Sequence, residues 1–396
     1  MDHYITNYNI DPPAGSICAV LEDSIMQKGH PVTTGSKILE GFVSPIDATV
    51  VTRLEAAGVC ILGKTKMEEF GICGLFGETG DGYKSYSQHE TEDGSMSHGF
   101  RSGAVAAVAD GAADFALCND YTGAVGREAA ERGLYYFRPT YGTVSRYGLI
   151  PAVQSMDQIG VVCKSPDEGI RVLSIIEGYD PKDGAMLTAA SPQQSADADE
   201  GSGSMTRPPP APPNMDNVRL GIPVSVLKQH EKKIKAEDFA GGFEIVEFEL
   251  KYSDIYDQVM QILCSAELSG NISRYDGVKF GYRAKGFTGI NELYTKSRTE
   301  ALGPDARLAA VLGAMVLSKE NYDRLYDKAM RIRRLIKESL EFDRYDVILT
   351  PSPCPLPMLC GLPALTMPYR GAGITLVADV GQTYSLFNGR GRINDL

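Results

Sequence analysis

Cysteines, histidines and glycine-rich loops are the residue types that most often bind metals, nucleotides or redox cofactors. Their spacing in this sequence argues against such sites. The eight cysteines form no C-x-x-C pair, and no histidine stands at zinc-ligand spacing from them. Several lie in apolar runs such as residues 58–62, so we expect small buried side chains in a reducing compartment. No G-x-x-x-x-G-K-S/T motif occurs, and no G-x-G-x-x-G follows a predicted strand. We therefore expect no metal, nucleotide or redox cofactor.

A lysine at the end of an apolar run is the next candidate for a catalytic residue. Residues 59–63 read Val-Cys-Ile-Leu-Gly and predict a short buried strand, which Lys64 follows directly. A lone lysine after a strand is most often a surface residue. By itself, Lys64 implies no chemistry.

The segments around Lys64 predict alternating helices and strands. Residues 47–57 have an acidic N-cap candidate, Asp47, and apolar residues at helical spacing, and Gly58 is expected to end this helix. Residues 102–118 predict a helix of small residues, a break at Gly111 and a strand. Such alternation favours an α/β fold with a largely buried sheet.

Two later segments continue this pattern. Residues 218–223 predict a strand that re-enters the core, and residues 319–341 carry apolar side chains at helical spacing. The arginines and lysines of that helix are interpreted as a solvated face rather than an RNA-binding patch, because the protein as a whole is acidic.

Composition and charge limit the classes of function. The 396 residues carry a formal net charge of −12, so the protein as a whole is repelled by phosphate backbones and anionic membranes. The N-terminus opens acidic and polar, and no apolar stretch approaches the ~20 residues that span a bilayer. We expect a cytoplasmic protein with no direct nucleic-acid or membrane contact.

A change in composition divides the chain. Residues 189–214 are rich in Ser, Asp and Pro and predict a flexible insertion, because they cannot bury enough apolar surface to offset their ordering entropy. They separate residues 1–188 from residues 215–396, which we expect to form the two halves of one core. A Pro-rich partner motif within the insertion is the alternative.

Several segments together resemble the amidase signature family, and within it the A subunits of glutamyl-tRNA(Gln)/aspartyl-tRNA(Asn) amidotransferases. The matching segments are residues 34–40, 47–51, 63–70, 138–149, 157–160, 273–283 and 345–351. The resemblance implies an α/β fold with a mixed, mostly parallel central sheet covered by helices on both faces. It also implies amide hydrolysis by a Ser–cis-Ser–Lys triad, in which a neutral buried lysine accepts a proton through the bridging serine and so activates the second serine.

The resemblance assigns each triad position to a residue of this chain. Lys64 stands where the family has its lysine. Arg101 occupies the position of the bridging serine, in residues 98–104, and Ala124 occupies that of the nucleophile, in residues 120–124.

The turn beside the nucleophile position would supply the oxyanion-binding backbone N–H groups of Tyr121, Thr122 and Gly123. Ala124 has no nucleophile, and an arginine keeps its proton and cannot relay one. Hydroxyls do stand nearby, since Ser102 is one residue from the bridging position and Thr122 two from the nucleophile. A shift of one residue at a helix start turns a side chain by ~100°, which argues against their use.

The residues that would hold a glutamine substrate also depart from the family pattern. Ala309 stands where the amidotransferase subunits have a carboxylate-binding arginine, and Arg307 is two residues away. The segment between Pro355 and Cys360 omits the stretch with the amine-binding aspartate. Residues 22–24 are Glu-Asp-Ser where Lys-Asp-Asn is usual, and the tail after Tyr369 no longer follows the pattern.

Three hypotheses follow. The chain is a pseudoenzyme that acts as a scaffold or partner subunit, with amidotransferase subunits B and C as the expected partners. Alternatively, it is an active amidohydrolase that uses Lys64 with Ser102 or Thr122, or it is a decaying paralogue without its own function.

Overall fold

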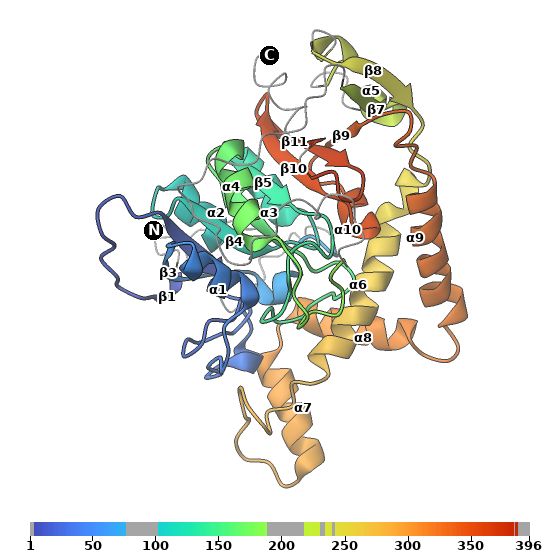
Figure 1. Ribbon diagram of the computed structural model, residues 1–396. Coiled ribbons are helices and arrows are strands. Elements are labelled where there is room, and N and C mark those ends of the chain that lie inside the picture. The colour runs from blue at the N-terminus through green and yellow to red at the C-terminus, as the bar shows by residue number, and fades with distance from the viewer. Residues whose placement is uncertain are drawn as a thin grey trace.

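The computed structural model describes residues 4–76, 102–187, 218–229, 234–239, 242–383 and 385–386. The strands of this part form one 11-stranded sheet with the order β1-β3-β2-β4-β6-β5-β10-β11-β9-β7-β8 (Figure 1). The strands are β1 (Tyr4–Asn7), β2 (Cys18–Glu22), β3 (Cys60–Thr65), β4 (Phe115–Asn119), β5 (Tyr135–Arg138), β6 (Ile159–Cys163), β7 (Arg219–Pro223), β8 (Glu244–Phe248), β9 (Val347–Pro351), β10 (Ala364–Tyr369) and β11 (Ala372–Ala378).

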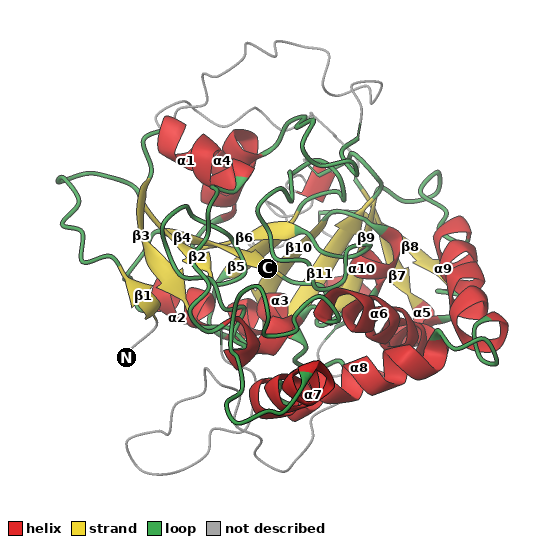
Figure 2. Cartoon of the chain, turned by 90° about the horizontal axis from the view of Figure 1, so that it is seen from below, coloured by secondary structure: helices red, strands yellow, loops and turns green. Residues whose placement is uncertain are grey.

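Helices cover both faces of the sheet (Figure 2). The described helices are α1 (Thr49–Ala56), α2 (Gly103–Ala109), α3 (Ala124–Glu131), α4 (Pro166–Ile176), α5 (Val224–Gln229), α6 (Tyr256–Ile272), α7 (Ile290–Ala301), α8 (Pro304–Val316), α9 (Lys328–Glu338) and α10 (Leu356–Cys360). Figure 2 shows α1 and α4 on one face and α2, α3 and α6 on the other, with α8 beyond α6. Apolar side chains of these helices and of the strands form the core.

The sheet is mixed, as the resemblance implies, but parallel pairs do not dominate it. Strand β2 is parallel to β3 and β4, and β7 is parallel to β8 and β9. The other six pairs are antiparallel. The expectation of a mostly parallel sheet is therefore wrong in that detail. Strands β10 and β11 are joined by a two-residue turn, so they must be antiparallel, and they lie in the middle of the sheet.

Both halves of the chain contribute to this sheet. They meet where β10 pairs with β5, with Leu365 opposite Phe137. The predicted insertion at residues 189–214 lies outside the described residues, and the division into residues 1–188 and 215–396 stays a prediction.

Most of the predicted elements lie where the pattern places them, with one difference at a helix start. The predicted strand at 59–63 is β3, and the helix and strand within 102–118 are α2 and β4. Helix α1 ends before Gly58, whose φ is +81°. Asp47 does not cap this helix, because its carboxylate accepts a hydrogen bond from Lys28 N at 2.7 Å, and Ala48 takes the N-cap position.

The helix predicted over 319–341 is shorter and less regular than its pattern suggests. A π-helical segment, Asp323–Asp327, precedes α9. Leu335, which the pattern places on the buried face, is 45% exposed. Arg333 is half-buried rather than solvated, because it donates to Leu359 O at 2.5 Å and to Ser155 O at 2.9 Å.

The eight cysteines are all free thiols, and five of them are buried. Among the described residues, no group of three or more His, Cys, Asp or Glu side chains could hold a metal ion. None of the described helices is long and apolar enough to cross a membrane.

Candidate active site

Three parallel strands end at the same edge of the sheet and bring the candidate residues together. Leu21 of β2 pairs with Lys64 of β3 on one side and with Leu117 of β4 on the other. Lys64 and the segments that follow β2 and β4 therefore lie at neighbouring carboxyl ends of parallel strands, where α/β proteins commonly bind ligands. These segments are residues 23–24 and residues 120–123, which follow Glu22 and Asn119 at the strand ends.

Lys64 is fully buried. Its Nζ donates a hydrogen bond to the carbonyl oxygen of Ile25. Burial lowers the pKa of the amine to about 8, although the charges of Asp23 and Glu22 favour the ammonium form. At pH 7 most of the amine is therefore protonated.

Two buried carboxyl groups accompany this lysine. Burial raises the pKa of Glu22 to about 8, while hydrogen bonds from Ser24 Oγ at 2.6 Å and Asn119 N at 3.2 Å oppose the rise. Burial also raises the pKa of Asp23, whose Oδ2 accepts a hydrogen bond from Thr33 N at 2.8 Å. Its Oδ1 has no hydrogen-bond partner. Lys64 and these carboxyl groups form a buried charge cluster.

Sequence reasoning did not identify this cluster as the electrostatic partner of Lys64. It noted residues 22–24 only as a departure from the family pattern. The available signal was a run of three polar residues directly after a buried strand, in a position where unpaired charges are costly.

The turn before α3, to which the resemblance assigns the nucleophile position, is held by the carboxylate of Asp120. Gly123 is the N-cap of α3 with φ +85°, and Ala124 is the first residue of the helix. Asp120 Oδ1 accepts hydrogen bonds from Gly123 N at 2.7 Å and Thr122 N at 3.2 Å, and Oδ2 accepts one from Gly126 N at 3.0 Å. Two of the three N–H groups expected to bind an oxyanion thus already have an acceptor. The third residue, Tyr121, is buried.

The two hydroxyls proposed as substitutes have other partners. Ser102 is buried and is the N-cap of α2, where its Oγ accepts a hydrogen bond from Val105 N at 3.4 Å. Thr122 Oγ1 donates to Asp120 Oδ1 at 3.4 Å and accepts from Ala124 N at 3.4 Å. Neither hydroxyl is hydrogen-bonded to Lys64 in the described part of the chain. Arg101 lies outside the described residues.

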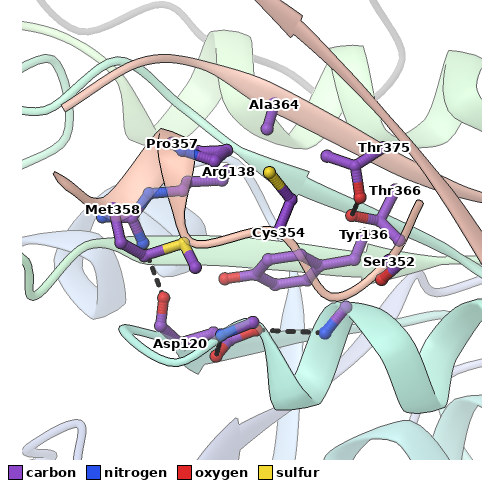
Figure 3. A pocket seen from close by; sticks show the side chains of 12 residues that line it. Asp120, Tyr136, Arg138, Ser352, Cys354, Pro357, Met358, Ala364, Thr366 and Thr375 are labelled. Atoms are coloured by element: carbon purple, nitrogen blue, oxygen red, sulfur yellow. Dashed lines mark hydrogen bonds between the residues drawn. The ribbon is translucent and has the colours of Figure 1, made fainter. Parts of the chain in front are cut away.

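A small hollow lies beside this turn. Figure 3 shows the Tyr136 hydroxyl and the Arg138 guanidinium beside it, with Asp120 below. Tyr136 Oη and Arg138 Nε are buried without a hydrogen-bond partner. The free space is about 20 Å³, which holds one or two water molecules. The lining residues are Asp120, Gly123, Gly126, Tyr136, Arg138, Ser352, Cys354, Pro357, Met358, Ala364, Thr366 and Thr375.

The two residues of α8 considered for substrate binding do not line this hollow. Ala309 is fully buried in α8, and Arg307 on the same helix is exposed. Neither lines the space beside Gly123.

Known proteins resemble this chain in sequence and in fold. A family model described as Amidase matches residues 1–368. Two of the relatives in sequence are A subunits of glutamyl-tRNA(Gln) amidotransferases. The one from Lachnoclostridium phytofermentans is 37% identical over 352 residues, which cover 86% of this chain and 68% of that protein. The one from Symbiobacterium thermophilum is 32% identical over 394 residues, which cover 90% and 76%.

Two solved structures show the likeness in fold. One of the amidotransferase A subunits, from Thermotoga maritima, superimposes with a TM-score of 0.67 at 22% identity, over 98% of this chain and 85% of that one. The native peptide amidase of Stenotrophomonas maltophilia gives a TM-score of 0.69 at 21% identity, over 96% and 82%.

Proposed function

We propose that this chain, which belongs to the amidase family, is a catalytically inactive member of it. Such a pseudoenzyme acts as a scaffold or partner subunit. The observation that carries the proposal is Ala124. Ala124 is the first residue of α3, and the resemblance assigns the family's nucleophile position to it; its methyl group cannot attack a carbonyl carbon.

The backbone around Ala124 supports the same proposal. An oxyanion hole needs N–H groups that point to the place where negative charge develops. The N–H groups of Thr122 and Gly123 donate to Asp120 Oδ1 instead. The carboxylate holds the turn in shape and takes up the donors that a tetrahedral intermediate would need.

In this proposal Lys64 is a structural residue. Its ammonium group donates to Ile25 O, and its charge favours the ionised form of Asp23. A buried lysine at this position then needs no catalytic explanation, because removing it would leave the carboxylate of Asp23 without a counter-charge.

The partners follow from the relatives. Their names identify them as the A subunits of a tRNA-dependent amidotransferase. We propose that this chain uses the corresponding surfaces to associate with subunits B and C of such an enzyme or with a similar partner.

One observation favours an active amidohydrolase. The pKa of Lys64 is lowered to about 8, so part of the population carries a neutral amine that can accept a proton. Ser102 or Thr122 would then be the nucleophile, and each would first have to leave the hydrogen bonds that it makes now. A decaying paralogue, the third hypothesis, predicts a broad and noncooperative melt instead of a folded scaffold.

Ammonia release tests the proposal. The purified chain is incubated with glutamine, asparagine and an aryl amide, next to Lys64→Ala and an active amidase as positive control. The proposal predicts the same background rate for the wild type and for Lys64→Ala. Turnover by the wild type that is lost in Lys64→Ala would establish the active amidohydrolase.

Co-purification tests the partner. The tagged chain is expressed with subunits B and C of its own organism and passed over affinity and size-exclusion columns. Co-elution supports the role of a partner in that complex, and a clean failure to co-elute at micromolar concentration refutes it.

A further inference from the structure

Two cysteines lie opposite each other on neighbouring strands. Cys18 is the first residue of β2 and Cys60 is the first residue of β3, and these two parallel strands pair Cys18 with Cys60. The backbone hydrogen bond from Cys60 N to Ile17 O, at 2.9 Å, belongs to the same register. Figure 2 shows both strands near the edge of the sheet that begins with β1.

The side chains of the two cysteines point to the same face of the sheet. The next residues, Ala19 and Ile61, pair with each other and belong to one core cluster. Successive side chains of a strand point to opposite faces, so Cys18 and Cys60 both point away from that cluster. Burial raises the pKa of the Cys18 thiol, and the charge and hydrogen bond of Cys60 add to the rise. The two thiols therefore interact.

The other cysteines on the described strands have no thiol opposite them. Cys118 on β4 pairs with Gly160, and Cys163 on β6 pairs with Tyr135. The register of the sheet thus brings one pair of thiols together.

The spacing of this pair suits a disulfide. Disulfides join Cα atoms about 4.4–6.8 Å apart, and adjacent strands lie about 4.8 Å apart. Cys18 is 9% exposed and Cys60 is half-buried, so a small oxidant reaches Cys60 first. The Cys18 thiol donates to Ser16 O at 3.7 Å, a weak hydrogen bond that is easily given up.

We propose that Cys18 and Cys60 are an oxidisable pair that closes a reversible, stabilising disulfide between β2 and β3, with hydrogen peroxide as the oxidant. The Cys60 sulfur attacks a peroxide oxygen and the O–O bond breaks. Cys60 becomes a sulfenic acid, and its proton leaves with the hydroxide as water. The Cys18 sulfur then attacks the Cys60 sulfur, the S–O bond breaks, and the Cys18 proton leaves with the hydroxyl group as a second water. The two sulfurs together lose two electrons, which the peroxide gains.

The disulfide closes a loop of the chain from residue 18 to residue 60, which contains α1. Closing a loop of this length restricts the unfolded chain, so the oxidised protein is the more stable form. In a reducing compartment the pair stays as two thiols until an oxidant is present, and a thiol reductant restores it. This chemistry does not depend on whether the chain hydrolyses an amide.

Peptide mapping after oxidation tests the pair. Reduced wild type, Cys60→Ser and Cys73→Ser are treated with hydrogen peroxide under native conditions, and the remaining thiols are then blocked with N-ethylmaleimide in denaturant. Cys73→Ser is the matched control, because Cys73 is also half-buried but lies in a turn rather than on a strand.

Trypsin separates the two cysteines. It cleaves after Lys28, Arg53 and Lys64, so the disulfide links the peptide of residues 1–28 to that of residues 54–64. Thermal unfolding of each oxidised and reduced protein is followed by circular dichroism.

The proposal predicts the linked peptide in the wild type and in Cys73→Ser, its loss after dithiothreitol, and its absence from Cys60→Ser. The melting temperature of the oxidised wild type should exceed that of the reduced protein by several degrees, without such a shift in Cys60→Ser. An oxidised wild type without the linked peptide overturns the proposal. So does a disulfide that leaves the melting temperature unchanged or lowers it.

Discussion

A half-buried glutamate, Glu69, lies beside the start of α8 and makes the stability of this protein depend on pH. Glu69 accepts hydrogen bonds from Ser36 Oγ at 2.5 Å and from Gly303 N at 2.9 Å, and Gly303 is the N-cap of α8. Burial raises the pKa of Glu69 from its usual 4.5 to about 6, although both hydrogen bonds favour the ionised form. The nearby Asp305 adds to the rise, and Arg307 opposes it.

The sign and size of the effect follow from this rise. Below pH 4.5 the carboxyl group is protonated in both the folded and the unfolded chain, so it makes no difference. Above pH 6 it is ionised in both, and the folded state has to keep a charge in a poorly solvated place. One pKa unit corresponds to about 1.4 kcal/mol, so Glu69 lowers the free energy of unfolding by about 2 kcal/mol as pH rises through this range.

The assay is equilibrium urea unfolding followed by circular dichroism, because the chain has no tryptophan. The free energy of unfolding of Glu69→Gln is compared with that of the wild type at several pH values from 4 to 7. The advantage of the variant should grow by about 2 kcal/mol between pH 4.5 and 6. Constant effects of the glutamine side chain cancel in this comparison.

A second variant should raise the pKa of Glu69 further. Ser36→Ala removes a hydrogen bond that favours the ionised carboxylate, so the pKa of Glu69 should rise and the loss of stability should extend to higher pH. A difference between wild type and Glu69→Gln that stays constant from pH 4 to 7 would refute the buried, poorly solvated carboxyl group described here.

Three further substitutions test the packing with the same urea assay. Gly148→Ala should lower the free energy of unfolding by more than ~2 kcal/mol, because its Cβ would lie 2.4 Å from a backbone atom and φ is +84°. Gly133→Ala should lower it by only about 1 kcal/mol, because φ is +76° there but no atom lies near the new Cβ. Arg333→Ala should lower the free energy of unfolding by roughly 2–3 kcal/mol, because it removes hydrogen bonds to part-buried backbone carbonyls. Arg334→Ala should stay within about 0.5 kcal/mol of the wild type, because the Arg334 side chain is 80% exposed. Asp120→Ala should cost about 1–2 kcal/mol, because the turn before α3 loses its acceptor; a neutral result would contradict that role.

Local sequence patterns predicted those parts of the fold that local physics determines. The apolar run before Lys64 is a strand, and the small residues of 102–118 form a helix followed by a strand. These elements depend on side-chain periodicity and on glycine positions, which can be read in a short window.

Contacts between distant parts of the chain could not be read in this way. Lys64 is buried beside Glu22 and Asp23, which precede it by about forty residues and reach it only because β2 and β3 are adjacent. Arg333 has the spacing of a solvated residue but meets Ser155 from a distant loop. Asp47 has the residue type of an N-cap, yet Lys28 N takes its carboxylate.

The triad positions required the family resemblance, since nothing in the residues themselves distinguishes Ala124 from other alanines. The structure adds what the resemblance could not supply. Asp120 accepts the hydrogen bonds of the turn, and the space beside it is about 20 Å³.

Covalent labelling tests most directly whether this protein has lost its nucleophile. The folded chain and an active amidase as positive control are incubated with a fluorophosphonate, which reacts with activated hydroxyl groups, and their intact masses are measured. If the nucleophile is lost, the control is labelled and this chain keeps its unmodified mass of 42.8 kDa. A stoichiometric adduct that maps to Ser102 or Thr122 and disappears in Lys64→Ala would contradict it.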